Sequence, residues 1–127
     1  MSYHEFLCLG QETVVVSMRH QLAYCTNVHA GSDLERTTDN LRRHALAVKQ
    51  RFSPRDPMGI GLWLAAPAVR QLQDAHQLPA FAAWLAECGL VPFTLNGFPQ
   101  GDFHEPVVKH RVYSPTWFEP DRVQYTF

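Results

Sequence analysis

The chain has 127 residues, of which 46% are hydrophobic and 18% charged, and its formal net charge is -1. This length suits a single domain with one core, and the near-neutral charge gives no electrostatic reason to expect nucleic acid or an anionic membrane as a partner. No apolar run approaches the roughly 20 residues that span a bilayer, so membrane insertion is not expected.

The cysteines are Cys8, Cys25 and Cys88, widely and irregularly spaced. An odd count at such spacing disfavours a disulfide framework and a zinc site of the Cys-x-x-Cys type. The N-terminus lacks a basic segment followed by an apolar one, the pattern of a secretion signal. We therefore expect a soluble, cytoplasmic protein.

Residues 1–17 are predicted to be an N-terminal extension outside the main fold. The β-branched run Thr13 to Val16 favours a short strand, which can pair with Phe6 to Leu9 as a hairpin. Met18 reads equally well as a chain start, so the main domain is expected to comprise residues 18–127.

The first predicted unit is a strand over Leu22 to Val28 followed by a helix. Its apolar and aromatic residues predict burial on both faces, as in a parallel sheet covered by helices. Ser32 with Glu35 three residues later has the pattern of a capping box, so the helix is expected to begin there. An apolar stripe at helical spacing continues to Phe52, where a proline-rich turn follows.

The second unit is a strand over Met58 to Ala65, followed by apolar residues at helical spacing up to Cys88. Gly59 and Gly61 lie inside the strand rather than after it, so they indicate a close backbone approach and not a phosphate-binding loop. Pro79 falls within the helical pattern and predicts a kink or two successive helices.

The third unit begins after Gly89, the expected stop of the preceding helix. Leu90 to Leu95 is an apolar, strand-forming run that leads into a loop rich in Gly, Pro and polar residues, ending at His104. In α/β folds, loops at the carboxyl ends of strands carry binding groups. Pro120 with its neighbouring acids predicts the start of a last helix.

Strands and helices thus alternate, which predicts an α/β fold of (βα) repeat units with parallel strands and right-handed crossovers. A complete (β/α)8 barrel needs roughly 250 residues, so the chain would supply about three of eight units, a partial TIM barrel. Open sheet edges must be covered, which favours a homo-oligomer or a longer chain that supplies the remaining strands. The alternative is a small, complete three-layer α/β domain.

Three strings are the most distinctive: YCTNVH at 24–29, GIGLWL at 59–64 and FTLNGFPQGDFH at 93–104. A pattern of spaced basic and aromatic residues then runs from Val108 to Tyr125. Together these stretches resemble EboE-type metabolite-traffic proteins, members of the xylose-isomerase-like TIM-barrel superfamily of sugar-phosphate isomerases and epimerases. The resemblance covers about 18–127, and family members are far longer, so it implies the N-terminal portion of such a barrel.

The resemblance implies a protein that binds or processes a small polar metabolite. In the related isomerases and epimerases, a divalent metal ion is held mainly by Glu, Asp and His from later strands that this chain does not contain. The chain alone is therefore expected to be inactive. The alternative is a metal-dependent sugar-phosphate isomerase or epimerase, completed by further strands or a second subunit. A non-enzymatic carrier on the same scaffold is a further reading.

His29 follows the first predicted strand and His104 the third, both at the expected carboxyl edge of the sheet. Neutral imidazoles there can bind a divalent metal or shuttle a proton, so both are candidate catalytic and metal-binding residues. The alternative is that each hydrogen-bonds a loop carbonyl and fixes its turn. Two ligands also fall short of the three or four protein groups that hold zinc.

Four further polar residues are candidates for binding a ligand: Asn27, Asn96, Asp102 and Lys109. The asparagines lie at strand ends, where an amide can orient a ligand hydroxyl or carbonyl, or can form a local turn instead. Asp102 precedes His104 and can act as an acid, a base or a partner of its imidazole. Lys109 can bind a phosphate or carboxylate. The alternative for Asp102 and for Lys109 is that the side chain is simply solvated.

Four aromatic side chains give the third loop and its continuation unusual apolar weight: Phe98, Phe103, Trp117 and Phe118. They are expected either to wall a ligand pocket or to pack the loop onto the rim of the sheet. Three other aromatic residues are expected in the core by their positions: Trp63, Phe81 and Trp84. Cys25 is expected to be a buried thiol without a catalytic role.

Overall fold

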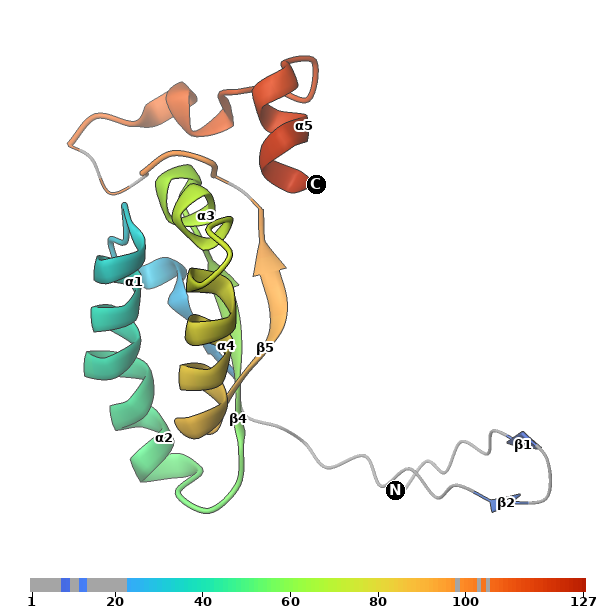
Figure 1. Ribbon diagram of the computed structural model, residues 1–127. Helices are drawn as coiled ribbons and strands as arrows, with labels where there is room; N and C mark the ends of the chain where they lie inside the picture. Colours follow the sequence, from blue (N-terminus) through green and yellow to red (C-terminus); the bar gives the residue numbers. More distant parts are fainter. Residues whose placement is uncertain (1–7, 10–11, 14–22, 98, 103, 105) are drawn as a thin grey trace, which may run out of the picture.

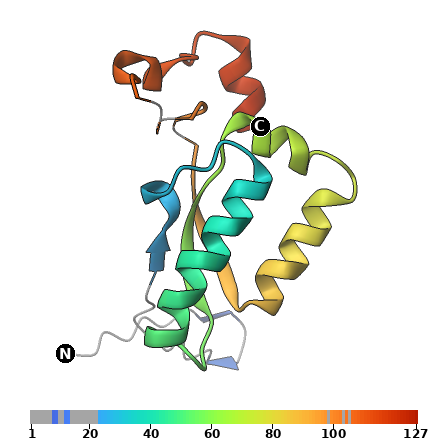
Figure 2. The same ribbon diagram turned by 90° about the vertical axis from the view of Figure 1, so that its left-hand side faces the viewer.

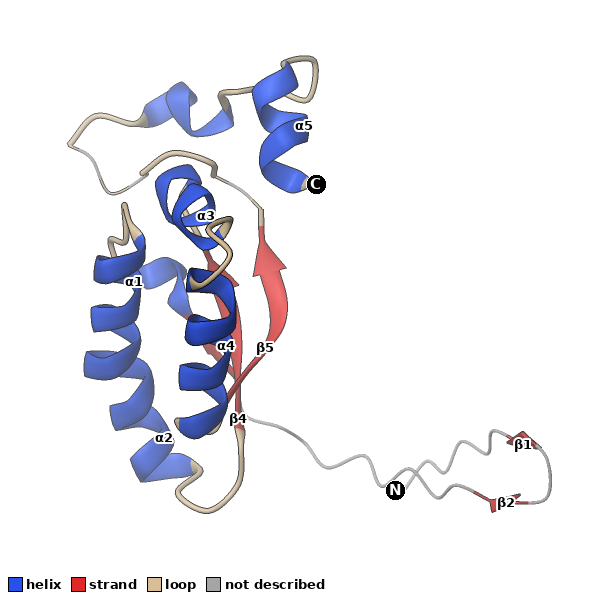
Figure 3. Cartoon of the chain, in the orientation of Figure 1, coloured by secondary structure: helices blue, strands red, loops and turns tan. Residues whose placement is uncertain are grey.

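The computed structural model describes residues 8–9, 12–13, 23–97, 99–102, 104 and 106–127. At the centre of this part of the chain is a sheet of three parallel strands: β3 (Ala23–Cys25), β4 (Met58–Trp63) and β5 (Leu90–Asn96). The strands lie in chain order, with β4 in the middle, so each helical connection joins neighbouring strands (Figures 1 and 3). The predicted α/β fold with parallel strands is confirmed.

Two helical connections link these strands. The first, after a short 3-10 turn (Thr26–Val28), is one continuous helix: α1 (Leu34–Asn40), a π-helical segment (Leu41–Ala45) and α2 (Leu46–Phe52). The second consists of α3 (Ala66–Leu72) and α4 (Gln77–Glu87), so the pattern around Pro79 marks two helices. After β5 come a 3-10 segment (Lys109–Tyr113) and α5 (Pro120–Thr126), which begins at the predicted proline.

The helices that connect the strands lie on one face of the sheet, and Figure 2 shows them in front of it. The side chains of β4 that point to this face are almost fully buried, with Met58 1% and Ile60 0% exposed. They belong to one apolar cluster with Leu41 of the first connection and Leu85 of α4. Because full burial of such a side chain contributes about 1.5–3 kcal/mol, this helix–sheet interface is the main source of stability.

The opposite face of the sheet carries no helix among the residues that the structure describes (Figures 1 and 2). Ala23 and Cys25 of β3 are exposed, and β5 is exposed beyond its first residue, with Phe93 at 61%. Burial of the first strand on both faces, and of the Cys25 thiol, was predicted. Both predictions are wrong because the sheet is covered from one side, and the three-layer alternative lacks its second helical layer in the described ranges.

The two glycines of β4 allow a close approach on this open face, as predicted. A Cβ atom at Gly59 would lie 3.1 Å from Cδ1 of Phe93, so the phenyl ring lies directly over the glycine. A Cβ atom at Gly61 would lie 3.0 Å from Oγ1 of Thr94. The register shifts between these positions, because Ile60 pairs with Pro92 and Gly61 with Thr94, which leaves Phe93 as the extra residue of a bulge.

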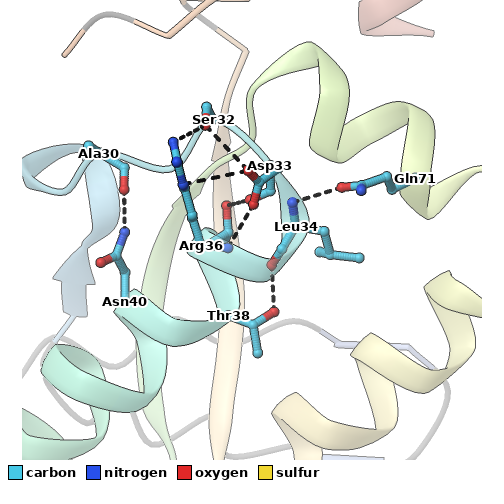
Figure 4. Close-up of polar contacts among 9 residues, drawn as sticks. Ala30, Ser32, Asp33, Leu34, Arg36, Thr38, Asn40 and Gln71 are labelled. Carbon is cyan, nitrogen blue, oxygen red and sulfur yellow. Dashed lines mark hydrogen bonds and ion pairs between the residues drawn. The ribbon is translucent and has the colours of Figure 1, made fainter. Parts of the chain in front are cut away.

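The first long helix is capped by Asp33 rather than by Ser32 (Figure 4). The Asp33 carboxylate accepts a hydrogen bond from the main-chain nitrogen of Arg36 at 2.8 Å. The Ser32 hydroxyl instead accepts from Nη1 of Arg36, also at 2.8 Å. The predicted start at Ser32 is therefore wrong by one residue, since a carboxylate at the N-terminus both satisfies a free N–H and complements the helix dipole.

Several local predictions are confirmed at the ends of elements. Gly89 ends the helical connection with a left-handed φ of 63°, which suits glycine. Trp63 and Phe81 are buried, and Trp84 is partly buried against the core.

None of the helices in the described ranges has both the length and the apolar character of a membrane span.

Two very short strands near the N-terminus, β1 (Cys8–Leu9) and β2 (Glu12–Thr13), pair in antiparallel fashion. This pairing agrees with the hairpin that the sequence predicts. The other residues of the predicted 1–17 extension lie outside the described residues, as does Leu22, the predicted start of the first principal strand.

Candidate functional site at the carboxyl end of the sheet

β3 ends at Cys25, three residues before the predicted end at Val28, and Thr26 then turns the chain toward His29. Its buried hydroxyl donates to the main-chain oxygen of Gly61 at 3.1 Å and accepts from the main-chain nitrogen of Trp63 at 2.9 Å. The hydroxyl thus replaces a strand partner for two groups of β4, and the chain is free to form a 3-10 turn. The prediction of a strand up to Val28 is wrong for this reason.

The loop that follows His29 is fixed onto the first long helix. Nδ2 of Asn40 donates to the main-chain oxygen of Ala30 at 2.5 Å (Figure 4). The helix itself is tied to the second connection, because the main-chain nitrogen of Leu34 donates to Oε1 of Gln71 at 2.8 Å (Figure 4). His29 therefore sits on a turn that is held by contacts at its start and shortly after it.

The loop after β5 is held over the end of β4 by Trp63. Nε1 of this buried tryptophan donates to the main-chain oxygen of Pro99 at 2.7 Å. The main-chain nitrogen of Ala66 also donates to the oxygen of Gln100 at 2.8 Å. Buried polar atoms of a tryptophan and a loop carbonyl satisfy one another here, so the loop crosses the sheet instead of leaving it.

His104 reaches across the sheet to the exit of β3. Its Nε2 lies 3.1 Å from the main-chain oxygen of Asn27, and since a carbonyl only accepts, Nε2 carries the proton. The main-chain nitrogen of His104 donates to Oδ1 of Asp102 at 2.9 Å. The Asp102 carboxylate therefore shapes the turn that presents the imidazole, which is the Asx-turn role.

His29 lies among aromatic and imidazole rings at the same edge. Its ring stacks on that of His44, with centroids 3.9 Å apart and planes 10° from parallel. The Tyr24 hydroxyl lies 2.5 Å from its Nε2. Partial burial, and then the repulsion of a protonated His44 or His104, hold the pKa of His29 below its usual range. The imidazole is therefore neutral at pH 7 and can accept or donate a proton.

Asn27 contributes its main-chain oxygen to this edge, whereas its side-chain oxygen is enclosed. Its side-chain oxygen Oδ1 is buried and has no hydrogen-bond partner in the part of the chain that the structure describes. A buried polar atom without a partner is destabilising, but this oxygen is closed to solvent and therefore also to a ligand. The structure thus brings together three predicted residues, His29, His104 and Asn27, with Asp102 in support.

Two residues of this site were not predicted from the sequence: Tyr24 and His44. His44 lies in the π-helical segment, next to the apolar stripe residues Leu41 and Ala45, and this position could have indicated that it faces the sheet. A π-helical turn within an α-helix often marks a functional site. Tyr24 lies in β3, the strand that leads to His29, and from the sequence its aromatic ring indicates only burial.

Metal binding by His29 and His104 was the other sequence prediction. In the described ranges, no three His, Cys, Asp or Glu side chains lie together in a way that could hold a metal ion. A zinc site takes three or four protein ligands. Coordination of zinc by these histidines would therefore need a donor from outside the part of the chain that the structure describes.

The remaining predicted residues lie elsewhere. Asn96 is the last residue of β5 and lines a separate apolar groove with Trp117 and Phe118. Lys109 is exposed at the start of the 3-10 segment and has a φ of 36°. Phe98 and Phe103 lie outside the described residues.

No protein-family model, curated protein or solved structure matches this chain.

Proposed function

We propose that the protein binds a small polar metabolite at the carboxyl end of its parallel sheet, through His29, His104 and Asn27. The observation that carries this proposal is the contact of the His104 imidazole with the Asn27 carbonyl. It places groups from the two outer strands of the sheet at one point, which is where (βα) proteins bind their ligands. We further propose that this takes place in the cytoplasm.

The scaffold is proposed to be a sector of a xylose-isomerase-like TIM barrel of the metabolite-traffic type. Three features support this: parallel strands in chain order, helices on one face, and an opposite face where Gly59 and Gly61 let side chains of β5 pack closely. In a barrel, the helix-free face is the inside, where side chains must fit a narrow interior. The remaining strands would come from a longer chain or from a second copy.

The chemistry of the site suits a ligand with several hydroxyl groups. The neutral His29 imidazole can exchange hydrogen bonds with a ligand hydroxyl. It is uncharged, so it favours recognition by hydrogen bonds over recognition of a strong charge. His104 fixes the loop that closes this edge.

We propose binding without turnover by this chain. The alternative, a metal-dependent sugar-phosphate isomerase or epimerase, requires a third metal donor that the described residues do not place beside the two histidines. Conversion of any sugar by the purified chain, with loss of that conversion in the His104→Ala variant, would contradict this part of the proposal.

The test is a titration with a defined panel of pentoses, hexoses and their monophosphates, followed by NMR of the histidine side chains. We expect at least one compound to shift the His29 and His104 resonances together, and to bind at least tenfold more weakly to His29→Ala and His104→Ala, the loss expected for one or two hydrogen bonds. His76→Ala is the control, because His76 is exposed at the start of α4 and should bind normally. Equal binding by all three variants would overturn the proposal.

A further inference from the structure

A large apolar groove lies beside the end of β5, and none of the site's histidines lines it. Its volume is about 920 Å³, and it is bounded by the end of β5, by α3 and by the C-terminal segment that ends in α5. Figure 1 shows these elements meeting at the end of β5. The volume lies in the range of pockets that hold one organic ligand, about 300–1,000 Å³.

The walls of the groove are mostly apolar. Leu64 and Leu72 are buried beneath it, whereas Leu95 is 64% exposed on the strand side. Trp117 and Phe118 face it from the C-terminal segment and are also largely exposed. Aromatic and aliphatic surface of this extent, left in contact with water, favours an apolar occupant.

The one charged side chain that lines the groove, among the residues the structure describes, is Arg122. It is buried, with 3% of its surface exposed. Its Nε donates to the Pro115 oxygen at 2.9 Å and its Nη1 to the Gly97 oxygen at 2.7 Å. The guanidinium also lies 5.8 Å from the ring centroid of Trp117 and 5.9 Å from that of Tyr125.

These partners satisfy hydrogen bonds but do not neutralise the positive charge. No carboxylate of the described residues lies within ion-pair distance of Arg122. Glu119, near it in sequence, instead accepts from the main-chain nitrogen of Thr116 at 2.7 Å. A buried cation without a counter-ion is unfavourable, and its field extends into an apolar groove because low-polarity walls screen it poorly.

We propose that this groove binds a free, single-chain amphiphilic carboxylate. Its apolar chain would lie against Leu95, Trp117 and Phe118, and its head group would lie on the side of Arg122. The apolar walls and the uncompensated cation are complementary to the two halves of such a molecule. This ligand is distinct from the polar metabolite proposed for the histidine site, and the two sites share none of the residues that carry the argument.

The test uses decanoate below its micelle-forming concentration, with decyltrimethylammonium as a probe of equal chain length and opposite charge. Calorimetric titration of the full chain should show decanoate binding at least tenfold more tightly, the preference expected for one charge-assisted contact. Equal affinities for the two probes, or no binding of decanoate, would overturn the proposal.

Two matched substitutions on β5 locate the site. Leu95 and Phe93 are 64% and 61% exposed, so a glutamate at either position should leave the fold intact, but of the two only Leu95 lines the groove. Leu95→Glu places a carboxylate in the groove that Arg122 also lines and should abolish decanoate binding, whereas Phe93→Glu should leave it unchanged. Equal effects of both substitutions would contradict the assignment.

Light scattering and vesicle sedimentation distinguish two other occupants of the groove. If a second copy of the chain fills the groove, light scattering will show a dimer that does not bind decanoate, and the proposal fails. If the groove docks on membranes, anionic phospholipid vesicles will sediment the chain while monomeric decanoate does not bind, and the proposal fails again. Binding of decanoate to a monomer of 14.5 kDa supports it.

Discussion

The imidazole of His104 donates to the main-chain oxygen of Asn27 over 3.1 Å, and 77 positions of sequence separate the two residues. This contact joins the loop after β5 to the turn after β3, across the end of the middle strand. It depends on two buried anchors, the Thr26 hydroxyl and the Trp63 indole, which hold the two segments in place. The position of this site therefore depends on these two anchors, which fix the segments that carry Asn27 and His104.

Replacement of Thr26 by valine should destabilise the fold. The change keeps the shape but removes the hydroxyl that joins the main chain of Gly61 and Trp63. Leaving those buried groups unpaired should lower the free energy of unfolding by about 1–3 kcal/mol, measured by urea denaturation. Thr38→Val is the control, because the Thr38 hydroxyl only adds to a helical carbonyl and its loss should stay within about 0.5 kcal/mol. Equal losses in both variants would contradict the role given to Thr26.

Asp33→Ala should destabilise the first long helix. The substitution removes the carboxylate that accepts from the Arg36 main chain and should lower the free energy of unfolding by about 0.5–2 kcal/mol. Ser32→Ala removes the contact with the Arg36 side chain and a long hydrogen bond to Oδ2 of Asp33, but no contact with a main-chain N–H of the helix, so it should change stability by less than about 0.5 kcal/mol. Thermal or urea unfolding of the two variants distinguishes the two capping residues. A larger loss of stability in Ser32→Ala than in Asp33→Ala would contradict the assignment of Asp33 as the cap.

Gly89→Ala should be unfavourable because of the backbone conformation. The residue has a φ of 63°, which disfavours any L side chain by about 1–2 kcal/mol. A Cβ atom there would also lie 2.8 Å from Cε of Lys49, but this is the flexible end of a long side chain and can move aside. Gly101→Ala is the matched control, because its Cβ atom would have no neighbour within 4 Å. Urea unfolding should show the loss at Gly89 alone, and the same loss at Gly101 would contradict the conformational argument.

Stability should depend on pH through His29. Its pKa in the folded chain lies below the ordinary value of 6.5, so the unfolded chain binds the proton more readily. The contribution to stability is complete above that ordinary value and is lost as the pH falls through the window down to the folded pKa. In His29→Gln, the decrease of the urea midpoint below pH 6.5 should be smaller than in the original chain. His76→Gln should retain the full decrease, and an unchanged slope in His29→Gln would contradict the prediction.

The alternation of strands and helices could be predicted from local patterns, because each signal lies within a few residues. Gly89 and Pro120 mark the ends of helices through their backbone preferences, and both were placed correctly. Asp33 and Ser32 are both good capping residues, so the choice between them depends on side-chain geometry that the sequence does not contain.

Burial was harder to predict than secondary structure. The apolar run from Leu90 to Leu95 reads as a buried strand, yet it lies at the edge of the described sheet and most of it is exposed. Hydrophobic periodicity cannot distinguish a strand covered from both sides from one that awaits a partner. The same limit explains why the groove beside Leu95 was not predicted, since its walls come from segments far apart in the sequence.

The candidate site was predicted in part. His29, His104 and Asn27 follow strands, and parallel strands bring their carboxyl ends to one edge, so their meeting follows from topology. The position of His44 beside Leu41 and Ala45 indicates that it faces the sheet, but its stacking on His29 also depends on the π-helical segment, for which the sequence has no local signal. Asn96 ends its strand as predicted but lines the groove instead of joining the histidines.

The most direct test of the converging histidine site is the pKa of His29 in the His104→Ala variant, measured by NMR titration of the imidazole. Removing His104 removes one of the repulsions that lower this pKa, so the account predicts a rise toward the ordinary value of 6.5. His110→Ala, which removes an exposed histidine of the 3-10 segment, should leave it unchanged. An unchanged pKa in His104→Ala would show that the two histidines do not meet, and would contradict the site on which the proposed function rests.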